Sequence, residues 1–238
     1  MKLIIDIGNT LVKAALFEKK ELIRSIIFEE CTLINLELFI DNDNIERTIL
    51  STVKNIDEDT VSVIEKFQAL TLSKNTLMPI KVKYKTPHTL GNDRLANAVA
   101  ASHLYEGKDV LVLDAGTCLK MDIVNNKKEY LGGRISPGLK MRYKSLNQFT
   151  AHLPLCDIVD SCNFFGDDTI SSIQSGVQNG IISEIDLLID AFMKENKDAI
   201  VIITGGDCFF FEKALKNSIF ADPFLMMKGL NVILDYNE

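Results

Sequence analysis

Several features that mark other classes of protein are missing from this sequence of 238 residues. Its longest unbroken apolar run is the five residues from Ala199 to Ile203, whereas a membrane-spanning helix needs about 20. Asp6 and Asn9 interrupt the apolar start of the chain too early for a signal peptide. We therefore expect a cytoplasmic protein with no membrane association. Basic residues are also outnumbered, 26 against 33 acidic ones, so general electrostatic binding to nucleic acid is not expected.

Cysteine pairs and the common nucleotide-binding motifs are missing as well. The five cysteines are odd in number and form no CxxC pair, so neither a disulfide framework nor a zinc ribbon is predicted. The chain has no GxxxxGK[ST] P-loop, and no GxGxxG follows a strand. What is present is an apolar content of 47%, which is ordinary for a folded chain and sufficient for one large domain or two small ones.

A repeat organises the sequence. Shifting the chain by 108 residues places residues 2–22 on residues 110–130 without a gap, and seven of the 21 positions are identical, among them Asp6 with Asp114 and Gly8 with Gly116. Each copy is typical of a strand that ends in an acidic residue, a glycine turn and a second strand. Two hairpins of similar composition would give the same pattern. A gene duplication would instead give two α/β domains, and we predict residues 1–107 and 108–238.

The remaining elements fit two α/β halves. Apolar spacing predicts helices over 59–70 and 91–107. A third helix is predicted from Pro137–Gly138 to Phe149, and a longer one begins at Asp168 or Thr169. Buried strands are predicted within 46–53 and at AIVIITGGD (199–207), with a helix after the latter.

An acidic residue, a glycine and a small hydroxyl residue after a buried strand can form a phosphate site. Glycine lets backbone N–H groups approach an anion, while the acid can hold a cation beside it. DIGNT (6–10) alone is equally typical of a structural turn, but DAGTC (114–118) and TGGD (204–207) strengthen the functional interpretation.

The sequence resembles the type III pantothenate kinases along essentially its whole length. The resemblance depends on motifs in a fixed order: DIGNT, GNDR (91–94), DAGTC, GGRISPG (132–138), TAHLP (150–154), FGDDT with IQSG (165–176), and TGGD. It implies two duplicated ribonuclease-H-like domains of the actin-like ATPase fold, with the active site in the interdomain cleft. It also implies that ATP phosphorylates pantothenate, as the first step of coenzyme A biosynthesis.

The resemblance also implies roles for particular residues. Asp93 of GNDR is the expected catalytic base, and Asp114 is expected to hold a monovalent cation, K⁺ or NH₄⁺. Asp6 is expected to orient Mg²⁺ through water. The expected ATP-binding residues are Asp6, Ile7, Gly8, Asn9, Thr10, Leu11, Val12, Lys13 and Thr117, and the expected substrate-binding residues are Tyr84, Gly91, Asn92, Asp93, Arg94 and Thr169.

Some of these residues have simpler interpretations. Asp93 could be only an N-cap, since a carboxylate at a helix N-terminus is held ionised by unsatisfied N–H groups. Arg94 could be a solvated residue of the first turn. Lys120 departs from the Thr common in the family, and Cys118 from the usual Ala, which leaves the geometry of the second turn open.

Assembly and activity also have alternatives at this stage. Gly176 and Gly180 give the long helix a smooth surface, and the resemblance implies a homodimer formed chiefly by the second domain. Pairing of two helices within one chain across these glycines is the alternative. Another small-molecule kinase, or a nucleotide-binding regulator without turnover, remains an alternative function.

Overall fold

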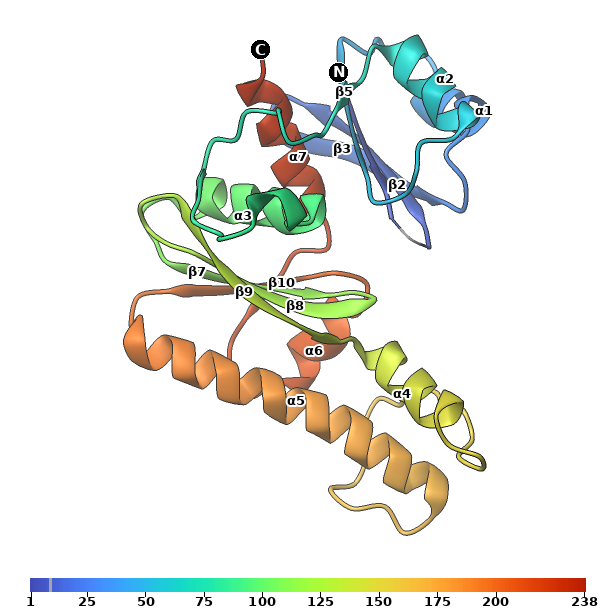
Figure 1. The fold of residues 1–238 in the computed structure, drawn as a ribbon, viewed down its shortest axis with the longest axis vertical. Coiled ribbons are helices and arrows are strands. Elements are labelled where there is room, and N and C mark those ends of the chain that lie inside the picture. Colours follow the sequence, from blue (N-terminus) through green and yellow to red (C-terminus); the bar gives the residue numbers. More distant parts are fainter. Residues whose placement is uncertain (9) are drawn as a thin grey trace. The chain divides into compact units, whose positions relative to one another are not determined.

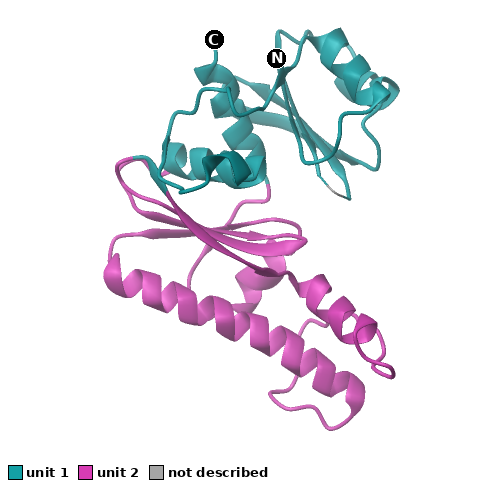
Figure 2. Cartoon of the chain, in the orientation of Figure 1, with its two compact units in different colours: residues 1–104, 128–130, 224–238 teal, residues 105–127, 131–223 magenta. Residues whose placement is uncertain are grey.

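The computed structural model describes residues 1–8 and 10–238 and divides the chain into two compact units. Unit 1 comprises residues 1–104, 128–130 and 224–238, and unit 2 comprises residues 105–127 and 131–223 (Figure 2). The chain first passes from unit 1 to unit 2 between residues 104 and 105, whereas the boundary predicted from the sequence follows residue 107. The C-terminal helix, which we expected in the second domain, makes its contacts within unit 1.

Unit 1 is built on a five-stranded sheet in the order β3-β2-β1-β4-β5. β1, β2 and β3 are antiparallel, whereas β4 and β5 run parallel to β1. Its elements are β1 Lys2–Ile7, β2 Val12–Glu18, β3 Glu21–Phe28, α1 Leu33–Ile40, β4 Arg47–Thr52, α2 Glu58–Phe67, β5 Leu70–Thr71, β6 Lys81–Val82, a 3-10 turn Pro87–Thr89, α3 Asn92–Leu104 and α7 Leu225–Tyr236.

Unit 2 repeats this topology. Its strands follow the order β11-β10-β7-β8-β9, with a hairpin of β7 and β8 and parallel pairing of β10 to both β7 and β11. The first residues of β9, 129–130, belong to unit 1 and pair there with β6. Its elements are β7 Val110–Ala115, β8 Cys118–Val124, β9 Glu129–Pro137, α4 Leu139–Gln148, α5 Thr169–Glu195, β10 Ile200–Thr204, α6 Cys208–Ala214 and β11 Phe220–Ala221. Strands 3-2-1-4-5 of one unit therefore correspond to 9-8-7-10-11 of the other, and the duplicated fold is confirmed.

Each unit has its own apolar core. In unit 1, Leu36 of α1 and Val63 of α2 belong to the same buried apolar cluster as Leu3 and Ile5 of β1. Figure 1 shows both helices beside the sheet. In unit 2, α4, α5 and α6 pack against β7, β8 and β10, and the apolar stripe of α5 includes Ile181 and Ile185. The first strand of each unit, β1 and β7, is mostly apolar because nearly all of its side chains are buried, on both faces of the sheet.

Candidate active site

The first hairpin turn lies in unit 1. Asp6 is the penultimate residue of β1, has only 8% of its surface exposed and lies opposite Lys13 of β2. The amide of Gly8 donates to the carbonyl of Leu11 at 3.0 Å and closes the turn. Of the other predicted ATP-binding residues, Ile7 and Val12 pack their side chains into the core of unit 1, so only their backbone could reach a ligand. Thr10 and Leu11 are exposed, and Asn9 lies outside the described residues.

The GNDR motif begins helix α3. Asn92 is the first residue of α3, and the carboxylate of Asp93 accepts a hydrogen bond from the backbone N–H of Arg94 at 2.8 Å. A Cβ at Gly91 would lie 2.5 Å from Oδ1 of Asp93. Glycine at position 91 therefore leaves room for this carboxylate at the start of the helix.

Arg94 is buried rather than solvated, with 5% of its surface exposed. Its guanidinium lies over the rings of Tyr84, at 5.6 Å, and Tyr130, at 5.9 Å, which is within the range of cation–π attraction. The two rings meet edge to face, with centroids 5.9 Å apart. The structure thus brings together Arg94 and Tyr84, both predicted at the substrate. Tyr130 was missed, because nothing in the sequence near it points to residues 84 or 94.

The second hairpin turn lies in unit 2 and contains an ion pair. Asp114 at the end of β7 is opposite Lys120 of β8, and Nζ of Lys120 lies 2.7 Å from Oδ2 of Asp114. Both side chains are only 15% exposed. The carboxylate that the resemblance assigned to a monovalent cation therefore already holds an ammonium group.

Gly138 brings the N-terminus of α4 against this second turn. Its amide donates to the carbonyl of Thr117 at 3.3 Å, and a Cβ at position 138 would lie 2.4 Å from the carbonyl oxygen of Gly116. Among residues 1–8 and 10–238, no side chain caps this end of α4. The last glycine of GGRISPG thus permits the close approach of two backbones, and the uncapped N–H groups of α4 can bind an anion.

The TGGD motif approaches the same turn. Gly205 has a φ of +95°, and a Cβ there would lie 2.5 Å from the carbonyl oxygen of Ala115. The amide of Asp207 donates to that oxygen at 3.0 Å. Burial raises the pKa of the Asp207 carboxyl, and the nearby charge of Lys140 partly opposes the shift. Three predicted motifs, DAGTC, GGRISPG and TGGD, therefore meet in unit 2.

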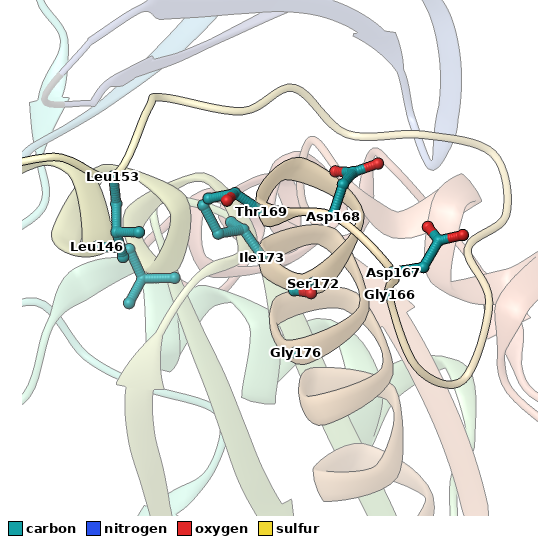
Figure 3. Close-up of a pocket in the computed structure, with 9 residues that line it drawn as sticks. All are labelled: Leu146, Leu153, Gly166, Asp167, Asp168, Thr169, Ser172, Ile173 and Gly176. Carbon is teal, nitrogen blue, oxygen red and sulfur yellow. The ribbon is translucent and has the colours of Figure 1, made fainter.

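Thr169 lies elsewhere in unit 2, at a cavity of about 660 Å³ beside the start of α5 (Figure 3). Leu146, Leu153 and Ile173 form its apolar part, while Asp168 and Thr169 are polar. Asp168 is the N-cap of α5, as predicted. Hydrogen bonds from residue 171 hold the pKa of the Asp168 carboxyl below its usual value.

Polar side chains of α5 hold the irregular segment 150–168 that borders this cavity. The side-chain oxygen of Gln178 accepts from the hydroxyl of Tyr143 at 2.8 Å and from the amide of Val159 at 2.9 Å. Its side-chain nitrogen donates to the carbonyl of Val159 at 2.8 Å. One helical turn earlier, Gln174 donates to the carbonyl of Asp157 at 3.2 Å. Polar residues on an amphipathic helix are ordinarily solvated, so this arrangement could not be predicted from the spacing of residues along α5.

Two further findings concern the described part of the chain as a whole. Residues 1–8 and 10–238 contain no group of three or more His, Cys, Asp or Glu side chains that could hold a metal ion. Over the same residues, no helix is both long and apolar enough to cross a membrane.

The paired topology defines a class of protein, the actin-like ATPase fold with two ribonuclease-H-like domains. Three solved structures have similar folds over 99% of this chain and more than nine-tenths of their own. A conserved putative Baf family transcriptional activator from Campylobacter jejuni has a TM-score of 0.62 at 23% identity, covering 99% of this chain and 98% of that one. A putative N-acetylmannosamine kinase from Listeria monocytogenes has a TM-score of 0.54 at 14% identity, covering 99% of this chain and 98% of that one. The activator of 2-hydroxyisocaproyl-CoA dehydratase from Clostridium difficile, with bound ADPNP, has a TM-score of 0.51 at 11% identity, covering 99% of this chain and 93% of that one.

Sequence comparison identifies the family within this class. The family model for type III pantothenate kinase matches residues 2–191. A type III pantothenate kinase of Bacteroides fragilis is 42% identical over 240 residues, covering 100% of this chain and 99% of the relative. One from Christiangramia forsetii is 41% identical over 246 residues, with the same coverage. The chain belongs to the type III pantothenate kinase family.

Proposed function

We propose that this protein transfers the γ-phosphoryl group of ATP to the primary hydroxyl of pantothenate, the first step of coenzyme A biosynthesis. The observation that carries the proposal is the match to type III pantothenate kinases at 42% identity over the whole chain. The other small-molecule kinases of this fold are the alternative, and they lack this full-length similarity: the Listeria kinase is 14% identical.

Asp93 is the proposed general base. In phosphoryl transfer the protein chiefly aligns the reactants and neutralises charge. The carboxylate of Asp93 would accept the proton of the pantothenate hydroxyl as that oxygen attacks the γ-phosphorus. Gly91 and Asn92 would contact the same substrate. Arg94 would place a fixed positive charge near the pantothenate carboxylate, and Tyr84 would orient that guanidinium through its ring.

The two hairpin turns are the proposed phosphate sites. Residues Asp6 to Lys13 and Thr117 would bind ATP, and Thr117 lies beside the N-terminus of α4, which no described side chain caps. A divalent metal accompanies the nucleotide in kinases of this kind, and we propose Mg²⁺. The residues fit it, because Mg²⁺ is usually held by one or two carboxylates together with substrate phosphates, and Asp6 supplies a buried carboxylate. When bound, Mg²⁺ would neutralise phosphate charge.

A monovalent cation at Asp114 does not fit the residues present. K⁺ or NH₄⁺ would have to share this carboxylate with the ammonium of Lys120, which already lies 2.7 Å from it. Two positive charges at one carboxylate repel each other. We therefore assign no step to a monovalent cation at this position.

We also propose a cytoplasmic homodimer formed chiefly by unit 2, with Thr169 at or beside the interface and near the substrate. Gly176 and Gly180 support this proposal. Among the described residues, nothing lies within 4 Å of a Cβ built at either glycine. The alternative, an intramolecular helix packed across these glycines, has no counterpart in that part of the chain.

A coupled assay tests the substrate. ADP release should require pantothenate as acceptor, and common sugars should give only background. Turnover of a sugar with no turnover of pantothenate would favour the alternative kinase and contradict the proposal.

A matched pair of variants tests the base. Asp93→Asn should lower kcat roughly 100-fold or more while the Kd of ATP changes little. Asp59→Asn is the control, because Asp59 is also an aspartate in the first turn of a helix, α2, and is exposed. Unchanged turnover of Asp93→Asn would remove Asp93 from the catalytic role.

A further inference from the structure

We propose that the ammonium group of Lys120 permanently occupies the place of the monovalent cation that the family resemblance implies at Asp114. This inference rests on the proposed function. The protein would then carry its own fixed cation beside the second phosphate turn, and its activity would not depend on K⁺ or NH₄⁺.

The position of Lys120 follows from the register of the second hairpin. In the antiparallel pairing of β7 with β8, Lys120 is the residue directly opposite Asp114. Side chains of residues directly opposite each other lie on the same face of the sheet, with Cβ atoms about 5 Å apart. A lysine side chain extends over this separation easily. Its Nζ reaches Oδ2 of Asp114 at 2.7 Å, a charge-assisted hydrogen bond.

The first hairpin has the same arrangement. Lys13 of β2 is the residue directly opposite Asp6 of β1, as Lys120 is opposite Asp114. The ungapped shift of 108 residues pairs Lys120 with Val12 instead, because the turn of the first hairpin is one residue longer. The inference therefore depends on the contact that Lys120 makes with Asp114 beside the second turn and not on a difference between the two hairpins.

The ion pair adjoins the backbone that would receive phosphate. A Cβ built at Gly116 would lie 3.3 Å from Oδ1 of Asp114, so the carboxylate also lies against the turn itself. The N-terminus of α4, at Gly138, packs on the same turn. A positive charge held on Asp114 is therefore next to the uncapped N–H groups of α4. Preorganised positive charge of this kind stabilises the negative charge of a transferring phosphoryl group.

The ammonium group of Lys120 and a bound K⁺ or NH₄⁺ ion differ in one testable respect. A dissociable cation must be supplied by the solvent, so the rate of the reaction and the affinity for nucleotide vary with its concentration. A lysine side chain is covalently attached, and both quantities are then independent of the choice of monovalent salt.

The first experiment compares the unmodified protein in chlorides of K⁺, Na⁺ and N-methylglucamine at equal ionic strength, with Mg²⁺ constant. We expect kcat and the Kd of ATP to agree within about 2-fold in all three salts. Activation by K⁺ of 10-fold or more over N-methylglucamine would overturn the proposal. The Kd is measured without an acceptor. A protein that binds ATP equally in all salts but does not phosphorylate pantothenate would contradict the proposed function and leave this inference supported.

The second experiment removes the charge. Lys120→Thr introduces the residue common in the family, and we expect its kcat in N-methylglucamine to fall at least 10-fold and to recover in K⁺ or NH₄⁺. Lys144→Thr, an exposed position on α4, is the control and should behave like the unmodified protein in every salt. A fall in the kcat of Lys120→Thr that is equal in all salts would show that the lysine does not replace a cation.

A conservative variant covers the case in which Lys120→Thr does not fold. Lys120→Arg keeps the charge and can still reach the carboxylate, so its kcat and its Kd of ATP should stay independent of the salt. K⁺-dependent ATP binding by Lys120→Arg would contradict the proposal, because the residue would then have failed to exclude the metal.

Discussion

The segment 150–168 should detach from α5 when the side-chain amide of Gln178 is removed. We consider Gln178→Met, which keeps the length and approximate volume of the side chain. Gln178 is 1% exposed and makes three hydrogen bonds, one with Tyr143 and two with the backbone of Val159. The substitution leaves the carbonyl and amide of Val159 and the hydroxyl of Tyr143 without this partner.

The magnitude follows from counting these bonds. Each intramolecular hydrogen bond contributes about 1 kcal/mol net, so three predict a loss of about 3 kcal/mol in the free energy of unfolding of unit 2. For a chain of this size, that corresponds to a fall of roughly 6–12 °C in the thermal midpoint. Gln174→Met is the matched control, because it makes the same substitution one helical turn earlier on α5. Among the described residues, the Gln174 side chain makes one hydrogen bond, of 3.2 Å, at a less buried site, and its loss should lower the free energy of unfolding by less than about 1 kcal/mol.

Denaturant unfolding and amide hydrogen exchange measure the two variants. Exchange should accelerate in residues 150–168 of Gln178→Met while the sheet of unit 2 stays protected, since local opening requires less free energy than global unfolding. Equal losses in the two variants, or unchanged exchange in this segment, would refute the reasoning.

Three further outcomes are expected. Gly229→Ala should lower the free energy of unfolding by roughly 2 kcal/mol in denaturant titrations, because its Cβ would lie 1.8 Å from the carbonyl oxygen of Ala96; unaltered stability would mean that α7 and α3 move apart freely. Burial raises the pKa of the Asp207 carboxyl, so the charged carboxylate that forms as the pH rises destabilises the folded state. Asp207→Asn removes this charge and should therefore raise the thermal midpoint more at about pH 8 than at about pH 4. Equal shifts at both pH values would contradict that. Light scattering should give twice the chain mass of 26.6 kDa, and a Gly180→Leu variant should give the single mass; a monomeric unmodified protein rules the dimer out.

Local sequence signals predicted many of the elements correctly. The helices predicted over 91–107, from Pro137–Gly138 and from Asp168 or Thr169 are α3, α4 and α5. Their starts agree to within about two residues, because capping residues and glycines act within one turn. The repeat predicted the duplicated topology, since an acidic residue after an apolar strand marks both hairpins.

Relations between distant residues could not be predicted. The contacts of Arg94 with Tyr130 and of Gln178 with Val159 depend on how separate elements pack, and a single sequence carries no signal for such pairs. Lys120 was recognised as a departure from the family, but its partner became evident only from the hairpin register. The membership of α7 in unit 1 is likewise a property of packing and not of spacing.

That membership of α7 has a consequence for the synthesis of the chain. Nζ of Lys2 in β1 bonds to the carboxylate of Asp235 at 2.5 Å, and the side chain of Asn231 donates to the carbonyl of Lys19 at 2.9 Å. Domains generally fold from the N-terminus as they leave the ribosome. Here residues 1–104 of unit 1 lack α7 until residues 225–236 have been synthesised, whereas unit 2 has all of its residues by position 223. β1 is therefore made before the whole of unit 2 but acquires its full set of native contacts after it.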